Sequence, residues 1–181
     1  MEIIDIVDEN GNPTGETVDR EIAHAQGLRH RTAHVWLLRN RGGEIQVLLQ
    51  KRSLNKDSHP GCYDISSAGH IPAGVDYIPS ALRELKEELG LDVDADELHY
   101  CGQRHIFFKE AFHHREFVDN QVSNVYYVWK DVELEQLTLQ ASEVDDVLWM
   151  GLAQCKRAVR ENLFEHCIVM EELDMLPQEH I

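Results

Sequence analysis

The stretch AGHIPAGVDYIPSALRELKEELGL, from Ala68 to Leu91, contains the clearest helix signal of the chain. Its residues from Asp76 to Leu89 predict one helix, with Pro79 in the first turn, where a missing N–H costs little. Gly90 follows at the position where a glycine commonly ends a helix by adopting a left-handed conformation. The sequence therefore predicts a helix that both begins and ends within this stretch.

Acidic residues of this helix gather beside its apolar face. At about 100° per residue, the carboxylates of Glu84, Glu87 and Glu88 fall on one narrow face, at the edge of the stripe that would face the core. That stripe consists of Ala81, Leu82, Leu85 and Leu89. Like charges on adjacent turns repel by roughly 0.2–0.5 kcal/mol per pair, which a hard cation such as Mg²⁺ would relieve. The helix alone also fits a solvated charged face, so both alternatives stay open.

The segments around the helix predict short strands and further helices. Residues 2–7 and the turn DENGNPTG predict a short β-hairpin within residues 1–20. The apolar runs HRTAHVWLLRN and EIQVLLQKR predict a second, largely buried hairpin. DREIAHAQ predicts a short helix, LHYCGQRHIFFK and NQVSNVYYVWKD predict strands, and LAQCKRAVRENLFEHCIVMEELDML predicts one or two helices. This order predicts an α+β fold with a mixed sheet between helices.

Length and composition restrict the class of protein. The 181 residues, of which 43% are hydrophobic, suffice for one core, so a single domain over residues 1–181 is expected. No apolar run is long enough to span a membrane, and the start MEIIDIVDENGN lacks the layout of a signal peptide. The four cysteines lie far apart, which disfavours a zinc site or a disulfide framework. We therefore expect a soluble cytoplasmic protein.

The charge of the chain restricts its partners. A formal net charge of -16 disfavours binding to nucleic acid or to an anionic membrane. The same charge repels a phosphate-bearing small molecule, unless a bound divalent cation reverses the field locally.

The spacing within residues 69–91 resembles the Nudix box, G-x5-E-x7-R-E-U-x-E-E-x-G-U, in which U is an aliphatic residue. Eight of the nine specified positions match. They are Gly69, Arg83, Glu84, Leu85, Glu87, Glu88, Gly90 and Leu91. The resemblance implies the Nudix fold, a mixed sheet sandwiched between helices, and hydrolysis of a diphosphate linked to another group, often a nucleoside.

The resemblance also implies a role for each matched polar residue. Glu87 and Glu88 would be the principal ligands of Mg²⁺, or of Mn²⁺ in its place. Glu84 would be a further ligand or the base that activates water, and the carbonyl oxygen of Gly69 would complete the coordination. Arg83 would orient the acids through charge-assisted hydrogen bonds. Such metals neutralise phosphate oxygens and lower the pKa of a bound water.

One position departs from the box. Val75 stands where the family has a glutamate that supports Arg83 or the metal site. Asp76 is one residue late and one methylene shorter, so we expect it to cap the helix N-terminus rather than replace that glutamate. Two alternatives follow: a slower hydrolase that keeps at least one metal, or a module that has lost catalysis and kept binding.

The flanking segments HRTAHVWLL, LLQKRSLNKDSHPGCYD and Gly69-His70 resemble the isopentenyl diphosphate isomerase branch of the same fold. In that branch, basic residues matching Arg52 and Lys56 grip a diphosphate, although this loop equally fits a solvated surface. The branch requires a cysteine where this chain has Ala68. Its metal is held by three histidines and two glutamates, and the corresponding residues here are His24, His30, His70, Asp119 and Gln121. Because glutamine is a poor substitute for a charged ligand, hydrolases with isomerase-like flanks fit the chain better.

These observations predict a Mg²⁺-dependent hydrolase of a nucleoside diphosphate derivative or a similar small molecule. The binding module and the isomerase remain the alternatives, and a homodimer is expected from the resemblance alone. Glu143, in SEVDDVLWM, is a candidate for one more catalytic carboxylate, although an exposed acidic turn is the expectation for such a segment. His113 and His114 are expected in a surface loop.

Overall fold

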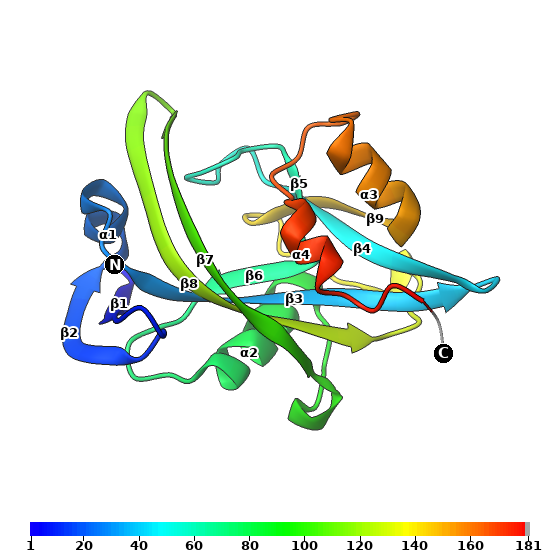
Figure 1. Cartoon of the computed structure of the whole chain (residues 1–181), viewed down its shortest axis with the longest axis horizontal. Helices are drawn as coiled ribbons and strands as arrows, with labels where there is room; N and C mark the ends of the chain where they lie inside the picture. The colour runs from blue at the N-terminus through cyan, green and yellow to red at the C-terminus, as the bar shows by residue number, and fades with distance from the viewer. Residues whose placement is uncertain (180–181) are drawn as a thin grey trace.

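The structure is a computed structural model that describes residues 1–179. Its main element is a seven-stranded sheet in the order β5-β4-β3-β8-β7, with β6 also paired to β3 and β9 to β4 (Figure 1). The strands are β3 (His30–Arg41), β4 (Glu44–Arg52), β5 (Tyr63–Asp64), β6 (Ser67–His70), β7 (His99–Phe112), β8 (Arg115–Trp129) and β9 (Val144–Gly151). β3 and β8 run parallel while the other pairs are antiparallel, so the sheet is mixed, as expected.

Alternating side chains of β3 supply both faces of the sheet with a core. Trp36 and Leu38 pack in a cluster with residues of α3 (Leu152–Arg160) and α4 (Met170–Asp174). Val35 and Leu37 point the other way and pack in a cluster with residues of α2 (Tyr77–Leu89). Because successive side chains of a strand face opposite sides, one buried strand joins the two helical layers. The expected α+β sandwich is confirmed.

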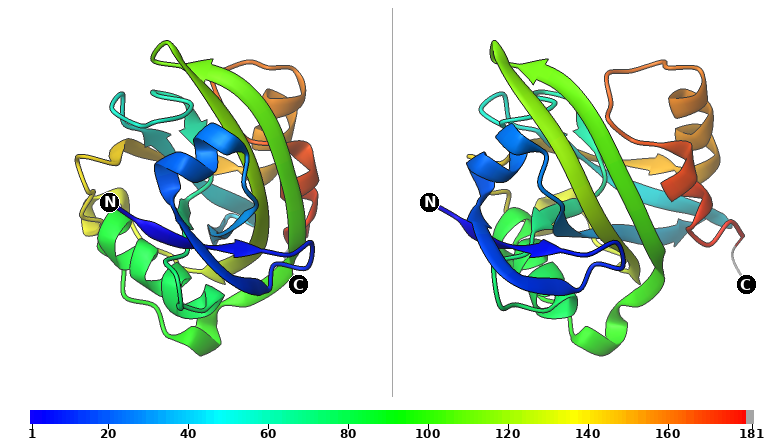
Figure 2. Two further views of the ribbon diagram at one scale, coloured as in Figure 1. Left: turned by 90° about the vertical axis from the view of Figure 1, so that its left-hand side faces the viewer. Right: turned by 60° about the vertical axis from the view of Figure 1, so that its left-hand side comes forward.

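The N-terminal residues form the predicted hairpin and short helix. β1 (Ile3–Val7) pairs antiparallel with β2 (Pro13–Asp19), and α1 (Arg20–Gln26) follows at once. The Asp19 side chain caps α1 by accepting from Glu21 N, and Gly27 ends it at φ 69°. Figure 2 brings this unit to the front, where α1 lies beside β8. Residues of α1 therefore reach the same region as strands β3 and β8.

Helix α2 matches its prediction except at its start. Gly90 ends it in the left-handed conformation, at φ 68°, and donates to the carbonyl oxygens of Leu85 and Lys86. Asp76 occupies the N-cap, but its side chain makes no capping hydrogen bond, so the predicted side-chain cap is wrong. Val75, where an acid was expected, packs against the apolar cluster under α2.

The rest of the described chain agrees with the expected element types. The C-terminal segment forms two helices, α3 and α4, and the four cysteines are free thiols. Among the helices of residues 1–179, none has the length and apolar character that crossing a membrane requires.

Candidate functional site

Strands β4 and β6 share one neighbour and leave an opening between them. β6 pairs with residues 32–35 of β3, whereas β4 pairs with residues 38–41 of the same strand. Glu88 of α2 lies between the two strands. Its Oε2 accepts from Gln50 Nε2 of β4 at 2.8 Å, and its Oε1 accepts from Ser67 Oγ of β6 at 3.1 Å. The topology of the sheet thus brings a helix carboxylate into the interior.

The environment of Glu88 disfavours its charged form. The residue is only 4% exposed. Burial, and next the charge of Glu84, raise the pKa of Glu88 to about 8. Burial also raises the pKa of Glu84. A nearby cation would favour the ionised form of both carboxyl groups and lower their pKa values.

Arg83 connects the other two acids of the helix. Its Nη2 donates to Glu84 Oε1 at 3.2 Å, and its Nε lies 3.7 Å from Glu87 Oε1. The Nε is nevertheless buried without a hydrogen-bond partner. Glu87 is half exposed, so Glu84 and Glu88 lie inward and Glu87 lies toward solvent.

Gly69 of β6 leaves the space that the Glu84 side chain occupies. A Cβ built on Gly69 would lie 2.4 Å from Glu84 Cδ and 2.5 Å from Cγ. These separations are far below a van der Waals contact, so any larger residue requires Glu84 to move. The first glycine of the box is thus next to the box acids in space, although 15 positions separate Gly69 from Glu84.

We expect Gly69→Ala to displace the Glu84 carboxylate and to lower turnover by about 10- to 100-fold, a change of roughly 1.4–2.7 kcal/mol in the barrier. Its effect on the free energy of unfolding is expected to be small, because Gly69 is not among the glycines with a left-handed backbone. A double-mutant cycle with Glu84→Gln tests whether Gly69→Ala lowers turnover by displacing the Glu84 carboxylate. Strongly non-additive losses of kcat are expected; losses that simply multiply would contradict the contact.

A cavity of about 530 Å³ joins these acids to Arg52, at the end of β4, and to Lys56, in the loop that follows. Arg52 donates from Nη1 to Asp64 Oδ2 at 3.1 Å and from Nε to Ser58 O at 3.1 Å. Lys56 forms an ion pair with Glu143. Arg52 and Lys56 therefore lie in the cavity wall rather than on a fully solvated loop.

Glu143 is only partly exposed, with 37% of its side chain accessible, so the expectation of an exposed acidic turn holds for it only in part. Glu143 lines the cavity and pairs with Lys56, because the turn before β9 lies against the loop after β4. Asp145 and Asp146 are exposed, as expected. His113 is in the turn between β7 and β8, and its Nε2 lies 2.8 Å from Lys56 O.

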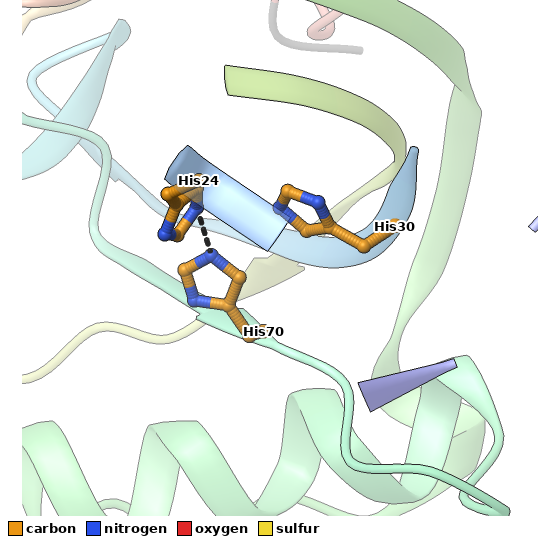
Figure 3. Close-up of side chains that lie close together, drawn as sticks. All are labelled: His24, His30 and His70. Atoms are coloured by element: carbon orange, nitrogen blue, oxygen red, sulfur yellow. Dashed lines mark hydrogen bonds between the residues drawn. The ribbon is translucent and has the colours of Figure 1, made fainter. Parts of the chain in front are cut away.

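Three histidines from three elements converge at another part of the cavity region. Figure 3 shows His24 of α1, His30 of β3 and His70 of β6 pointing toward one another. One nitrogen from each lies within 4.8 Å of the others, and His24 Nε2 is 3.2 Å from His70 Nε2. Burial, and then the neighbouring His30, lower the pKa of His24 to about 4 and that of His70 well below its usual value. Neutral imidazoles are the form that binds metals.

Asp119 of β8 adds a carboxylate to this histidine cluster. Its Oδ1 lies 3.4 Å from His30 Nε2 and 3.7 Å from His24 Nε2, and Oδ1 and His30 Nε2 both lack a hydrogen-bond partner. His30 Nδ1 lies 2.9 Å from Leu28 O. Because a carbonyl oxygen only accepts, Nδ1 carries a proton and the neutral ring offers Nε2 as a ligand. Gln121 donates to the other oxygen of Asp119.

The histidine cluster lies outside the set of site residues that the box selects. Its three nitrogens and one carboxylate oxygen have the chemistry of a divalent transition-metal site. The four residues are spread from position 24 to position 119, and their meeting depends on pairing of β3 with both β6 and β8.

A third group of polar residues lies where β3, β7 and α4 meet. Glu172 accepts from His34 Nδ1 at 2.9 Å, from Trp36 Nε1 at 3.0 Å and from Arg104 Nη1. Burial opposes every charge here, yet His34 and Arg104 together lower the pKa of Glu172 to about 2. Burial lowers the pKa of His34, but Glu172 outweighs it and raises that pKa above its usual value. Nothing in the sequence pattern had marked these residues.

Comparisons with known proteins agree with the geometry. The family model described as "NUDIX domain" matches residues 28–167. An uncharacterized Nudix hydrolase of Clostridium acetobutylicum is 38% identical over 143 residues, which are 79% of this chain and 66% of that one. Nudix hydrolase 3 of Arabidopsis thaliana is 39% identical over 152 residues, which are 82% of this chain and 19% of that one. The chain thus spans less than two thirds of the length of these two relatives.

The isomerase-like flanks and the fold also have counterparts. An isopentenyl-diphosphate Delta-isomerase of Escherichia coli is 29% identical over 155 residues, which are 85% of this chain and 79% of that one. A crystal structure from Deinococcus radiodurans superimposes with a TM-score of 0.67 at 19% identity, covering 96% of this chain and 97% of that one. At that identity the likeness concerns the fold.

Proposed function

The chain belongs to the Nudix family, and on that premise we propose that it is a divalent-metal-dependent hydrolase that cleaves the diphosphate linkage of a small molecule. The observation that carries the proposal is the buried Glu88 carboxyl beside Glu84 in a cavity that also contains Arg52 and Lys56. Turnover that requires added Mg²⁺ or Mn²⁺ and disappears in Glu87→Gln tests it. Turnover that is unchanged in this variant would contradict it.

The residues at the box fit a hard divalent cation. Glu84, Glu87 and Glu88 would hold Mg²⁺, or Mn²⁺, together with the carbonyl oxygen of Gly69. The fit rests on the donor set, which is entirely oxygen, and on the raised pKa of Glu88 in its absence. The metal, when bound, would neutralise phosphate oxygens and make a water more acidic.

The chain's own groups position the reaction. Arg83 orients Glu84, which accepts the proton of the attacking water. Gln50 and Ser67 hold Glu88 in place through hydrogen bonds to both of its oxygens. Arg52 and Lys56 bind the diphosphate oxygens, since guanidinium and ammonium groups form charge-assisted hydrogen bonds with phosphate. We propose a nucleoside diphosphate or a derivative of one as the substrate and a homodimer as the assembly, both by family analogy.

Two observations bear on the weaker alternatives. Arg83 Nε has no hydrogen-bond partner, and Val75 stands where the family has an acid. A catalytically impaired binding module would have the same two features. The histidine cluster with Asp119 fits a second metal and favours the isomerase as a second candidate. That reaction needs a thiol where the chain has Ala68. Incubation with isopentenyl diphosphate under Mg²⁺ or Mn²⁺, followed by NMR, separates the two reactions, because isomerisation releases no phosphate.

The raised pKa of Glu88 predicts how pH changes the stability of the metal-free protein. The folded pKa of about 8 lies above the ordinary 4.5, so this carboxyl contributes stability below pH 4.5 that is lost as the pH rises through 8. Glu88→Gln stays neutral throughout. At pH 8.5 we expect the metal-free variant to have a Tm about 10 °C above that of the wild type, and at pH 5 a difference of only about 2 °C.

Scanning calorimetry in the presence of a chelator measures this difference. Added Mg²⁺ is expected to raise the Tm of the wild type more than that of Glu88→Gln, because the ionised carboxylate is then neutralised. A difference in Tm that does not depend on pH would contradict the assignment of the raised pKa to Glu88.

A further inference from the structure

His34, Arg104 and Glu172, here called the inner cluster, give one part of the cavity an excess of positive charge. All three line the cavity, and, within residues 1–179, Glu172 is the one buried carboxylate that serves both cations. Elsewhere in the wall each cation has its own acid. Arg52 is paired with Asp64, and Lys56 is paired with Glu143. In a chain whose net charge is -16, and in a cavity wall that contains more acids than Arg and Lys residues, such a locally basic corner is an exception.

Donors of the inner cluster remain available to a ligand. The Nδ1 of His34 is used by Glu172, so Nε2 is its second donor, and it lies 3.4 Å from Thr32 Oγ1. Arg104 is 8% exposed, and its Nε has no hydrogen-bond partner. Glu171 Oε2 lies 3.4 Å from that Nε, but its side chain is 70% exposed and is largely solvated. Arg104 Nε thus lacks a hydrogen-bond acceptor and His34 Nε2 has only a long one, and a bound anion would supply stronger acceptors to both.

We propose that the inner cluster binds a second anionic group of the substrate, a carboxylate or a phosphate on the group attached to the diphosphate. The inference rests on the proposed hydrolase function and names its substrate class: a diphosphate ester whose attached group is itself acidic. A cavity of about 530 Å³ is within the size range of sites for whole small molecules, so there is room beyond the diphosphate. If the cluster only anchored α4 to the sheet, turnover would not depend on the charge of the attached group.

Matched substrate pairs test the charge dependence. UDP-glucuronic acid and UDP-glucose differ in one carboxylate, and coenzyme A and 3′-dephospho-coenzyme A differ in one phosphate. We expect the member with the additional anionic group, in at least one pair, to have a kcat/KM about tenfold or more above that of the member without it. The difference is expected mainly in KM, as a charge-assisted hydrogen bond would give. The pair that shows the preference identifies the bound anionic group as a carboxylate or as a phosphate.

His34→Asn is the informative variant. The asparagine amide keeps a donor near the position of Nδ1 for Glu172, while the charge and the Nε2 donor are removed. We expect His34→Asn to lower the ratio of the two kcat/KM values within the pair toward one. His105→Asn is the matched control, because His105 is exposed on the same β7 strand as Arg104. It is expected to keep the preference.

A binding readout keeps folding and activity apart. Inorganic phosphate is expected to raise the Tm of the metal-free wild type and of His105→Asn, and to raise that of His34→Asn less. Hydrolysis without preference in either pair, or a preference that persists in His34→Asn, overturns this inference and leaves the proposed function standing. No hydrolysis of any diphosphate under either metal overturns both.

Discussion

Glu88→Gln is expected to lower kcat by about 10³-fold and to leave the fold intact. Glutamine keeps the shape of the side chain and still accepts a hydrogen bond from Gln50 or Ser67. It loses the charge that would hold the metal. Under the proposed mechanism several kcal/mol of transition-state stabilisation would depend on that metal, and each 1.36 kcal/mol is a factor of ten in rate.

Lys86→Gln is the control for this experiment. Lys86 is on the same helix, its side chain is 57% exposed, and it pairs with Asp92 rather than with a box acid. Its kcat is expected to stay within about twofold of the wild type, since surface ion pairs contribute little. Circular dichroism and Tm confirm the fold of both variants. A Glu88→Gln protein that keeps a tenth or more of the wild-type kcat would show that Glu88 does not hold the essential metal.

Glu172→Ala is expected to lower the free energy of unfolding by about 3–5 kcal/mol. The carboxylate accepts from His34, Trp36 and Arg104, and it is 2% exposed. Its loss leaves the buried Arg104 guanidinium with only the largely exposed Glu171 as a counter-charge, and it removes the buried hydrogen bonds that join α4 to strands β3 and β7. Urea denaturation at pH 7, with a constant slope between proteins, measures the change.

Glu171→Ala supplies the comparison for Glu172. The two residues are adjacent on α4, but the Glu171 side chain is 70% exposed. We expect its replacement to change the free energy of unfolding by about 0.5 kcal/mol or less. Equal losses from the two variants would mean that the buried network contributes nothing beyond the helix itself.

Local patterns were sufficient for the elements and for the box. The apolar stripe and the terminal Gly90 predicted α2, and all three box acids line one cavity as their common helix face requires. The alternation of β3 predicted a buried strand, and both sheet faces are covered. The single domain over residues 1–181, whose last two residues lie outside the described part, stays a prediction.

Long-range contacts explain what the sequence did not reveal. The resemblance to the isomerase branch had grouped His24, His30, His70 and Asp119, and the structure brings them together. Their meeting needs α1 beside β8, and β3 paired with both β6 and β8, none of which a local pattern encodes. Glu143 likewise lines the cavity only because its turn meets Lys56. Asp76 had the right residue type for a cap, but its side chain makes no bond to the helix, which begins without one. Glu172 was one acid among 33 Asp and Glu residues, and only its buried partners distinguish it.

Hydrolysis in ¹⁸O-labelled water is the decisive measurement. The wild type and Glu88→Gln are incubated with Mg²⁺ or Mn²⁺ and a panel of nucleoside diphosphates and triphosphates, nucleotide sugars, dinucleotides, coenzyme A and isopentenyl diphosphate, and the products are read by mass spectrometry. We predict that the wild type alone forms a phosphate product that carries one ¹⁸O, because water attacks phosphorus at the box. A product without label, or the same labelled product at the same rate from Glu88→Gln, would contradict metal-dependent diphosphate hydrolysis at this site.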